Sequence, residues 1–302
     1  MLREFIHKMK LKNAGPLYVL VAAILWSTAG VGIKYIPWSP LSIASMRGVV
    51  AAFTFMIVIA SFSKREGTAK ISIREWKASL TRSTIMAALC LQCTMLLFIT
   101  ANHFTTAANA AVLQYTAPVY VMILMFIVQK VKPKPLEIVT IIVTFLGITL
   151  FFLDYLGEGA MLGNLAGMLS GVTFAGVFYF NSLPDSNPAR ASFMAFSMSA
   201  LLLPAMFFDP AVSAGGVVPW IVVILLGVFQ LGLAYFIFAK GIRSTGAVSA
   251  SIICMTEPIL SPIWVVMIIG EYPGPFALVG GVLVIGVVAA YNIINARVHK
   301  TG

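Results

Sequence analysis

Long apolar runs alternate with short polar breaks along the whole chain. A helix rises about 1.5 Å per residue, so about 20 mostly apolar residues cross the roughly 30 Å hydrocarbon core of a bilayer. The runs of about this length predict ten spanning helices, at residues 14–33, 40–62, 83–102, 106–129, 135–153, 160–182, 190–208, 217–239, 245–269 and 275–296. The breaks between them are too short to hold a soluble domain.

Composition leads to the same class of protein. Apolar residues make up 60% of the 302 residues and charged residues only 10%, whereas soluble domains carry about 25% charged residues. A soluble fold of this chain would expose large apolar patches, which soluble monomers avoid, and disordered chains are poor in apolar residues. We therefore predict an all-α polytopic membrane protein in a lipid bilayer.

The basic residues predict how the helices are oriented. The chain carries 20 Lys and Arg against 10 Asp and Glu, a net charge of +10, which in a soluble protein would indicate nucleic-acid binding. With the N-terminus in the cytoplasm, the ten spans instead place 18 of the 20 basic residues in cytoplasmic segments. Only Lys34 lies outside, and Arg47 lies within the second span. Cytoplasmic loops are enriched in Lys and Arg, so we expect a multi-pass protein of the cytoplasmic (inner) membrane with both termini in the cytoplasm and no nucleic-acid partner.

The first dozen residues, MLREFIHKMKLK, are basic and amphipathic. They have the character of a signal-peptide n-region, but the apolar run that follows has full membrane length and lacks a convincing small-x-small cleavage site. We expect an uncleaved first span that is preceded by a basic cytoplasmic segment at residues 1–13.

The two halves of the chain resemble each other. A shift of 140 residues aligns the segment from Thr105 with the segment from Thr245, with nine identities in 35 positions. All three prolines of the first window find a partner, in the pairs Pro118/Pro258, Pro133/Pro273 and Pro135/Pro275. A weaker match at a shift of 148 residues adds the pairs Gly15/Gly163 and Trp26/Phe174.

This repeat predicts two five-helix units, at residues 14–156 and 157–297, followed by a cytoplasmic tail at residues 298–302. Because five is an odd number, the second unit starts on the opposite side of the membrane, and the two units are inverted relative to each other. Inverted repeats with a substrate site near the midplane are typical of secondary transporters. Two similar halves can exchange roles, so that the site opens to either side at comparable energy.

Several stretches resemble a known family. They are AILWSTAGVGIKYIPWSPLSIASMRGVVAAF at 23–53, Thr116-Ala117-Pro118, Thr256-Glu257-Pro258, and the run from Glu257 through Glu271 to GGVLVIG at 280–286. Together they resemble the ten-helix EamA-type members of the drug/metabolite transporter superfamily. The resemblance implies a ten-helix secondary carrier with two five-helix repeats, of a kind that usually exports amino acids or other small metabolites. One position departs from the pattern, because Val131 stands where members often carry an acidic residue.

Glu257 is the sharpest candidate for chemistry, because it lies near the middle of the ninth span. A carboxylate at that depth costs several kcal/mol unless it is paired, protonated or facing water. We expect Glu257 to bind a cationic group of the substrate or a coupling proton; the alternative is a protonated side chain bonded to a neighbouring helix. Pro258 and Pro262 follow it and, with Pro118 in the fourth span, are candidate hinges, since proline frees backbone carbonyls of the preceding turn.

Aromatic and amide side chains complete the expected substrate site. An aromatic ring beside a carboxylate favours an ammonium group. The expected lining comprises Trp26, Gln114, Tyr115, Phe174, Phe178, Tyr179, Tyr235 and Trp264. For each of these aromatic residues, packing between helices or against lipid is the alternative.

Three further groups have an open interpretation. Arg47 either binds a substrate carboxylate through two hydrogen bonds or pairs with another element of the protein. His103, between the third and fourth spans, either titrates with pH or is a solvated turn residue. Gln92 and Gln230 are polar groups within spans, for which a hydrogen bond to a neighbouring helix is the default. Cys90 and Cys93 match C-x-x-C, but in an apolar helix we expect neither a disulfide nor a metal site.

The sequence predicts a transporter and no enzyme. It has only three histidines and carries no H-E-x-x-H helix, phosphate-binding loop or nucleophile elbow, so we expect no cofactor and no metal. The expected function is secondary-active transport, with the resemblance favouring export, of amino acids or related amines by alternating access, with protons as a candidate coupling partner. The alternatives are an exporter of quaternary ammonium compounds or cationic drugs, a facilitative channel, or a non-transporting membrane scaffold.

Overall fold

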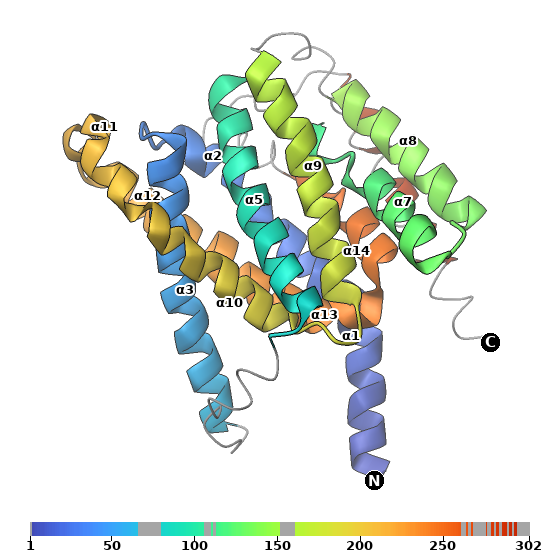
Figure 1. The fold of residues 1–302 in the computed structure, drawn as a ribbon. Helices are drawn as coiled ribbons and strands as arrows, with labels where there is room; N and C mark the ends of the chain where they lie inside the picture. The colour runs from blue at the N-terminus through green and yellow to red at the C-terminus, as the bar shows by residue number, and fades with distance from the viewer. Residues whose placement is uncertain are drawn as a thin grey trace.

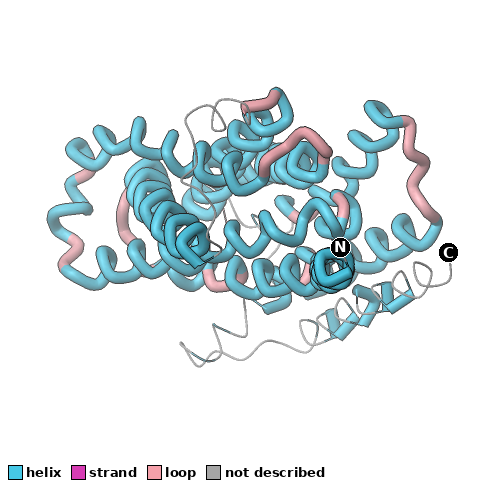
Figure 2. The backbone as a smooth tube through the Cα atoms, turned by 90° about the horizontal axis from the view of Figure 1, so that it is seen from below, coloured by secondary structure: helices cyan, strands magenta, loops and turns pink. Residues whose placement is uncertain are grey.

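The computed structural model describes residues 2–65, 80–105, 110, 113–151 and 161–260, together with single positions between 264 and 294. Nearly all of these residues are helical, and the helices pack as a bundle (Figure 1). Figure 2 shows the bundle from below, with the N-terminal helix seen nearly end-on. The tenth expected span, 275–296, lies mostly outside the described residues.

The first half of the chain contains six described helices. They are α1 (Leu2–Trp26), α2 (Ala29–Lys34), α3 (Pro40–Arg65), α5 (Arg82–Phe104), α7 (Ala117–Gln129) and α8 (Pro135–Phe151). Local sequence sets several of their ends. The Thr81 side chain accepts a hydrogen bond from the Thr84 amide and so caps α5. Lys130 ends α7 in the left-handed conformation, at a φ of 57°.

The second half forms three long helical runs and one interrupted helix. Its elements are α9 (Met161–Ser182), α10 (Pro188–Met198), the 3-10 segment η2 (Ser199–Phe208), α11 (Pro210–Ala214), α12 (Val217–Leu225), the π-helical segment η3 (Leu226–Leu233), α13 (Ala234–Thr245) and α14 (Ala247–Cys254). Asn187 and Asp209 cap α10 and α11 through their side-chain oxygens. The runs from α10 into η2 and from α12 through η3 to α13 are continuous.

Six of these helical runs are long and apolar enough to cross a membrane. They are Ala14–Ile33, Pro40–Ser61, Arg82–Phe104, Met161–Ser182, Pro188–Phe208 and Val217–Thr245. Shorter apolar helices at Ala117–Gln129, Pro135–Gly147 and Ala247–Leu260 lie within the fourth, fifth and ninth expected spans. Large apolar side chains remain exposed on their outer faces, with Phe207 88% and Met161 86% exposed, as expected for surfaces that meet lipid. The protein is a polytopic helical membrane protein.

Three spans differ from continuous helices, because each contains a two-residue turn. The turns lie at Ser27–Thr28, Tyr115–Thr116 and Met255–Thr256. In each turn the threonine hydroxyl donates to the carbonyl three residues earlier, with distances of 2.7 Å for Thr28, 2.6 Å for Thr116 and 2.8 Å for Thr256. Backbone carbonyls within a membrane need a donor from the protein. The threonines supply one where the helical ladder is broken.

The first helix also begins earlier than expected. It runs from Leu2, so the basic segment at residues 1–13 is helical from its second residue and continuous with the span.

The longest helix contacts repeat the internal symmetry of the sequence. α5 packs along α9, side by side in Figure 1, and α1 packs along α13. At one contact a Cβ on Gly163 would lie 2.6 Å from the Thr105 amide nitrogen, and at the other a Cβ on Gly15 would lie 2.8 Å from the Thr245 hydroxyl. Gly15 pairs with Gly163 in the sequence repeat, and Thr105 pairs with Thr245. Each half therefore presses its glycine against the matching threonine of the other.

Candidate functional site

A buried cavity of about 40 Å³ lies at the junction of the two halves. Its lining comprises Trp26, Arg47, Thr94, Met95, Phe98, Ile99, Gln114, Phe174, Gln230, Leu231, Tyr235 and Glu257. A single water needs about 10–15 Å³ measured in this way, so the cavity has room for a few water molecules in this conformation. We call it the central cavity.

Glu257 lies at the point where the ninth span resumes its helix after the Met255–Thr256 turn. Its side chain is 8% exposed and lines the central cavity. Tyr115, from the matching turn of the fourth span, lies close enough to interact with the carboxylate. The Tyr115 hydroxyl nevertheless has no partner with hydrogen-bond geometry among the described residues. The interrupted helices thus bring a carboxylate and a phenol together in the interior of the bundle.

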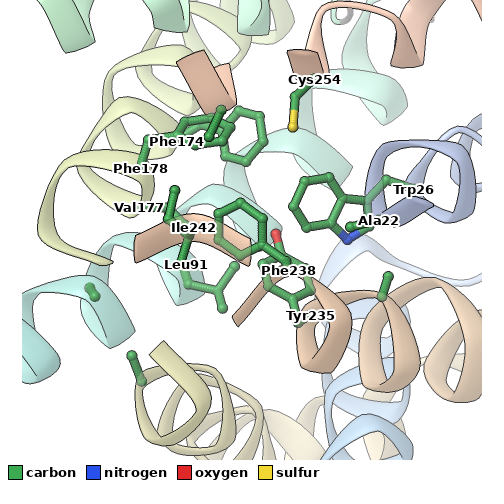
Figure 3. Packing of buried hydrophobic residues seen from close by; sticks show 14 of the residues in the cluster. Ala22, Trp26, Leu91, Phe174, Val177, Phe178, Tyr235, Phe238, Ile242 and Cys254 are labelled. Carbon is green, nitrogen blue, oxygen red and sulfur yellow. The ribbon is translucent and has the colours of Figure 1, made fainter. Parts of the chain in front are cut away.

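Aromatic rings form one wall of the central cavity. The Trp26 ring lies 4.6 Å from Tyr235 and 6.0 Å from Phe174, measured between ring centroids. Phe178 and Phe238 pack behind them, with Phe174 and Phe178 at 4.6 Å, and Figure 3 shows these rings gathered between the helices. The indole N–H of Trp26 is buried and has no hydrogen-bond partner among the described residues.

Arg47 of α3 is only 4% exposed and lines the same cavity. Its Nη2 donates to the Gln230 side-chain oxygen at 2.6 Å. Its Nε and Nη1 are buried, and neither has a hydrogen-bond partner in the part of the chain that the structure describes. Arg47 and Glu257 are the two charged side chains in the lining, and no hydrogen bond joins them.

Polar side chains on the opposite helices are already paired. The Ser170 hydroxyl donates to the side-chain oxygen of Gln114, which lines the cavity. The Thr94 hydroxyl lies within hydrogen-bond distance of the Cys90 carbonyl, at 2.7 Å, and of the Thr173 hydroxyl, at 2.8 Å. These bonds link α5 and the fourth span to α9, and they fix the wall that faces Arg47 and Glu257.

The remaining residues expected at the site do not line the central cavity. Tyr115 is buried beside Glu257 in a cluster with Met255 and Tyr291 and is not part of the lining. Tyr179 packs against Phe180, with centroids 5.2 Å apart.

Trp264 donates its indole N–H to Ser27 at 2.8 Å, at the turn between α1 and α2. Pro118 is one of the first two residues of α7, and Pro258 follows Glu257 at the matching place, so these prolines begin half-helices. Pro262 lies outside the described residues.

Several lining residues had no strong signal in the sequence. Gln230 stood out only as a polar group within a span, and the structure identifies Arg47 as its partner. The remaining ones are side chains typical of any apolar helix: Thr94, Met95, Phe98, Ile99 and Leu231. A single sequence does not distinguish such residues from the rest of the core.

A second cavity of about 200 Å³ lies next to the central cavity. Its lining comprises Ile33, Ile36, Trp38, Ile43, Ile99, Asn102 and His103. Ile99 of α5 lines both cavities and is the side chain they share. We call this second space the outer cavity, and His103 belongs to its wall.

Comparison with known protein families identifies the family of this chain. The sequence profile of the EamA-like transporter family matches residues 13–153 and matches a second time at residues 161–293. The chain belongs to the EamA-like transporter family, within the drug/metabolite transporter superfamily. The resemblance seen in the sequence motifs is thereby confirmed, and the protein is a transporter.

The chain is similar along most of its length to transporters from two bacteria and an archaeon. A chain from Bacillus subtilis strain 168, named uncharacterized transporter YwfM, is 27% identical over 281 residues, which cover 89% of this chain and 90% of the relative. The uncharacterized inner membrane transporter YicL of Salmonella typhimurium is 25% identical over 85% of this chain and 87% of its own. An uncharacterized transporter of Archaeoglobus fulgidus is 25% identical over 92% of this chain and 96% of its own.

The fold also matches a solved structure. A crystal structure described only as that of a protein superposes with a TM-score of 0.75, over 95% of this chain and 99% of the other, at 16% identity. This similarity shows that the EamA-like chain shares its fold with an experimentally determined structure.

Proposed function

We propose that this transporter moves an amino acid or a related amine by alternating access. In this proposal the chain has ten spanning helices in two inverted repeats, at residues 14–156 and 157–297, and both termini lie in the cytoplasm. The double match of the family profile and the repeated contacts of Gly15 and Gly163 support two similar halves. The distribution of Lys and Arg supports the orientation.

The buried carboxylate of Glu257 is the observation that carries the proposal. It faces a cavity built from both halves, and a carboxylate within the membrane is stable only with a proton or a positive partner. An ammonium group of the substrate provides that partner, and the rings of Trp26, Phe174 and Tyr235 add a favourable surface for a cation. When the site is empty, a proton takes the same place, so Glu257 is also the candidate for proton coupling.

The two halves differ in chemistry at this point. Ala117 holds the position in the first half that Glu257 holds in the second. The carboxylate is therefore present in only one of the two halves, which gives a bound cation a defined orientation.

The two cavities support a route to one side of the membrane. Ile99 lines both the central cavity and the outer cavity. The orientation that we propose places the outer cavity on the extracellular side, since it lies where α2 and α5 end. Movement of α5 would join the two spaces. The central cavity has room for only a few waters in this conformation, so binding of an amino acid requires the cavity to widen.

Counterflow exchange in proteoliposomes tests the proposal. Vesicles preloaded with single amino acids or amines are offered the same compound in radiolabelled form, at several pH values. We expect wild-type protein to accumulate label transiently and Glu257→Gln to lose this exchange or its pH dependence. Asp185→Asn, a matched change of an exposed acid in the loop before α10, should exchange like wild type. Unchanged exchange and pH profile in Glu257→Gln would remove Glu257 from the mechanism, and steady leakage without counterflow would indicate a channel.

A further inference from the structure

Arg47 raises a question that a simple amine substrate does not answer. Its guanidinium is buried, carries a fixed positive charge and uses one of its N–H groups on Gln230. Nε and Nη1 have no partner among the described residues. Removing such a charge from water without pairing it is costly. The side chain therefore needs an anionic partner that the described protein does not provide.

The geometry of the guanidinium fits a carboxylate. Nη2 has two hydrogens and gives one to Gln230, so the second is available together with a neighbouring N–H of Nη1 or Nε. The N–H of Nη2 forms one edge of the planar guanidinium together with an N–H of Nη1, and another edge together with the N–H of Nε. Each edge has the arrangement that binds both oxygens of a carboxylate. Arg47 thus retains a two-point binding edge while Gln230 holds the other side of the group.

Gln230 is held in place by an unusual segment. It lies in the π-helical segment η3, and short π-helical segments are frequent at functional sites. Gly227 and Gly232 let η3 approach α3 closely, because a Cβ on Gly227 would lie 2.6 Å from Val50 and one on Gly232 would lie 2.7 Å from Thr54. This close packing brings the Gln230 oxygen to Arg47. We assign Gln230 as a positioning residue for Arg47.

Arg47 and Glu257 share the central cavity without bonding to each other. They come from opposite halves of the chain. A ligand with only an ammonium group leaves Arg47 unpaired, and a ligand with only a carboxylate leaves Glu257 unpaired. A molecule with both groups satisfies both buried charges and brings no net charge into the cavity.

We propose that the central cavity binds a zwitterion, an α-amino acid, with its carboxylate on Arg47 and its ammonium group on Glu257. This rests on the transport function proposed above and narrows it, because it excludes simple amines and quaternary ammonium compounds as good substrates. The aromatic wall of Trp26, Phe174 and Tyr235 then faces the side chain of the amino acid.

Matched ligands test this inference on wild-type protein, without relying on any variant. Thermal stabilisation of purified protein is measured with each of the common amino acids, and the best one is compared with its decarboxylated amine and its deaminated acid; for phenylalanine these are phenethylamine and 3-phenylpropionate. A site that pairs with both groups rejects a ligand lacking one of them strongly. We expect at least about 100-fold weaker apparent affinity for each analogue. An amine that binds as well as its parent amino acid would overturn the zwitterion.

Variants then assign the two ends of the ligand. Arg47→Gln should lose discrimination between the amino acid and its amine, and Glu257→Gln should lose discrimination between the amino acid and its deaminated acid. Gln230→Glu places a carboxylate beside Arg47 and should weaken binding of the amino acid more than binding of its amine. Gln230→Asn should keep part of the preference for the amino acid.

The two proposals fail in different ways. If Arg47→Gln still prefers the amino acid to the amine, or if wild type exchanges amines best, Arg47 has no role in recognition and the amine transporter remains. If wild type is folded and monodisperse but neither binds nor exchanges any amino acid or amine, both the zwitterion and the proposed function are wrong.

Discussion

Trp26 and Phe174 hold matching positions in the two halves, and their rings meet edge to face with centroids 6.0 Å apart. Residues that match across a repeat touch each other only where the symmetry axis passes between them. In the proposed inverted repeat, the axis that relates the halves therefore runs beside the central cavity, whose lining includes both rings. A substrate there is in contact with both halves at once, which is what a site served by two exchanging halves requires.

Replacement of Gly163 by alanine should destabilise the protein. The new Cβ would lie 2.6 Å from backbone atoms of Phe104 and Thr105, which cannot rotate away. Overpacking of this kind costs about 1–3 kcal/mol. We expect a Tm lower by about 5 °C in detergent, measured by fluorescence-detected unfolding. At Gly167 on the same helix the new Cβ would lie 3.1 Å from the Leu113 Cβ, a contact that is milder than the one at Gly163, so Gly167→Ala should cost less. The reverse order would contradict the close backbone contact.

Thr256 should matter through its hydroxyl group. It donates to the Ile253 carbonyl at 2.8 Å, where the ninth span is interrupted. Thr256→Val keeps the shape and leaves that carbonyl with one donor fewer, at a cost of about 1 kcal/mol. We expect a Tm lower by about 2–4 °C, whereas Thr256→Ser should behave like wild type. Equal stability of the valine and serine variants would show that the hydroxyl does not support the interruption.

Asp209 should make stability depend on pH. Its carboxylate accepts hydrogen bonds from the Ser39 amide at 2.7 Å and the Ala211 amide at 3.1 Å, and so joins the loop before α3 to α11. Burial acts to raise the pKa of Asp209, but these bonds and the Ser42 and Ser39 hydroxyls outweigh it and hold the pKa below its usual value.

A folded-state pKa below that of the unfolded chain stabilises the protein above the unfolded pKa of about 3.9, and this contribution disappears as the pH falls through the folded pKa. Asp209→Asn keeps a capping oxygen but loses the charge and one of the two acceptor oxygens, so it should unfold at a lower temperature than wild type at pH 7, by about 2–4 °C for the weakened hydrogen bond to the Ser39 amide. The two proteins should converge as the pH falls below about 4. Asp185→Asn is the control for a change of charge alone. A Tm difference between Asp209→Asn and wild type that stays constant down to pH 3 would contradict the role of the carboxylate.

Ile99 should control passage between the two cavities, because it lines both. An indole at this position would fill the connection, so Ile99→Trp should slow counterflow at least about tenfold, the effect of about 1.4 kcal/mol on a barrier. Ile85→Trp provides the matched control, since Ile85 lies on the same helix with 38% of its surface exposed. Equal transport rates in the two tryptophan variants would show that the route runs elsewhere.

Six of the ten expected spans coincide with described helical runs that are long and apolar enough to cross a membrane, because membrane helices leave a long and simple signal. Pro118 and Pro258 also pointed to the fourth and ninth spans as special, since proline restricts the preceding helix. The turn at Ser27–Thr28 had no such marker, because no proline stands near it. Thr28 is recognisable as a turn residue only because its hydroxyl bonds in the same way as those of Thr116 and Thr256.

The site was harder to predict than the fold. Arg47 and Glu257 stood out because charge is rare within the spans, and both line the central cavity. The partner of Arg47 lies 183 positions away and depends on the π-helical turn that contains Gln230, a local change of register that the apolar pattern does not encode. Trp264 was expected in the lining of the substrate site, but its indole bonds to Ser27. Which way a large side chain turns depends on neighbours that are distant in sequence.

The fourth and ninth spans share the same interruption at Thr116 and Thr256, yet the next residue is Ala117 in one and Glu257 in the other. The interruption is thus encoded twice and the carboxylate beside it once. In the proposed mechanism, position 117 is the neutral counterpart of Glu257, so a carboxylate introduced there would stand at the matching turn of the other half. A redesign that adds an acidic group to the first half would therefore begin at position 117.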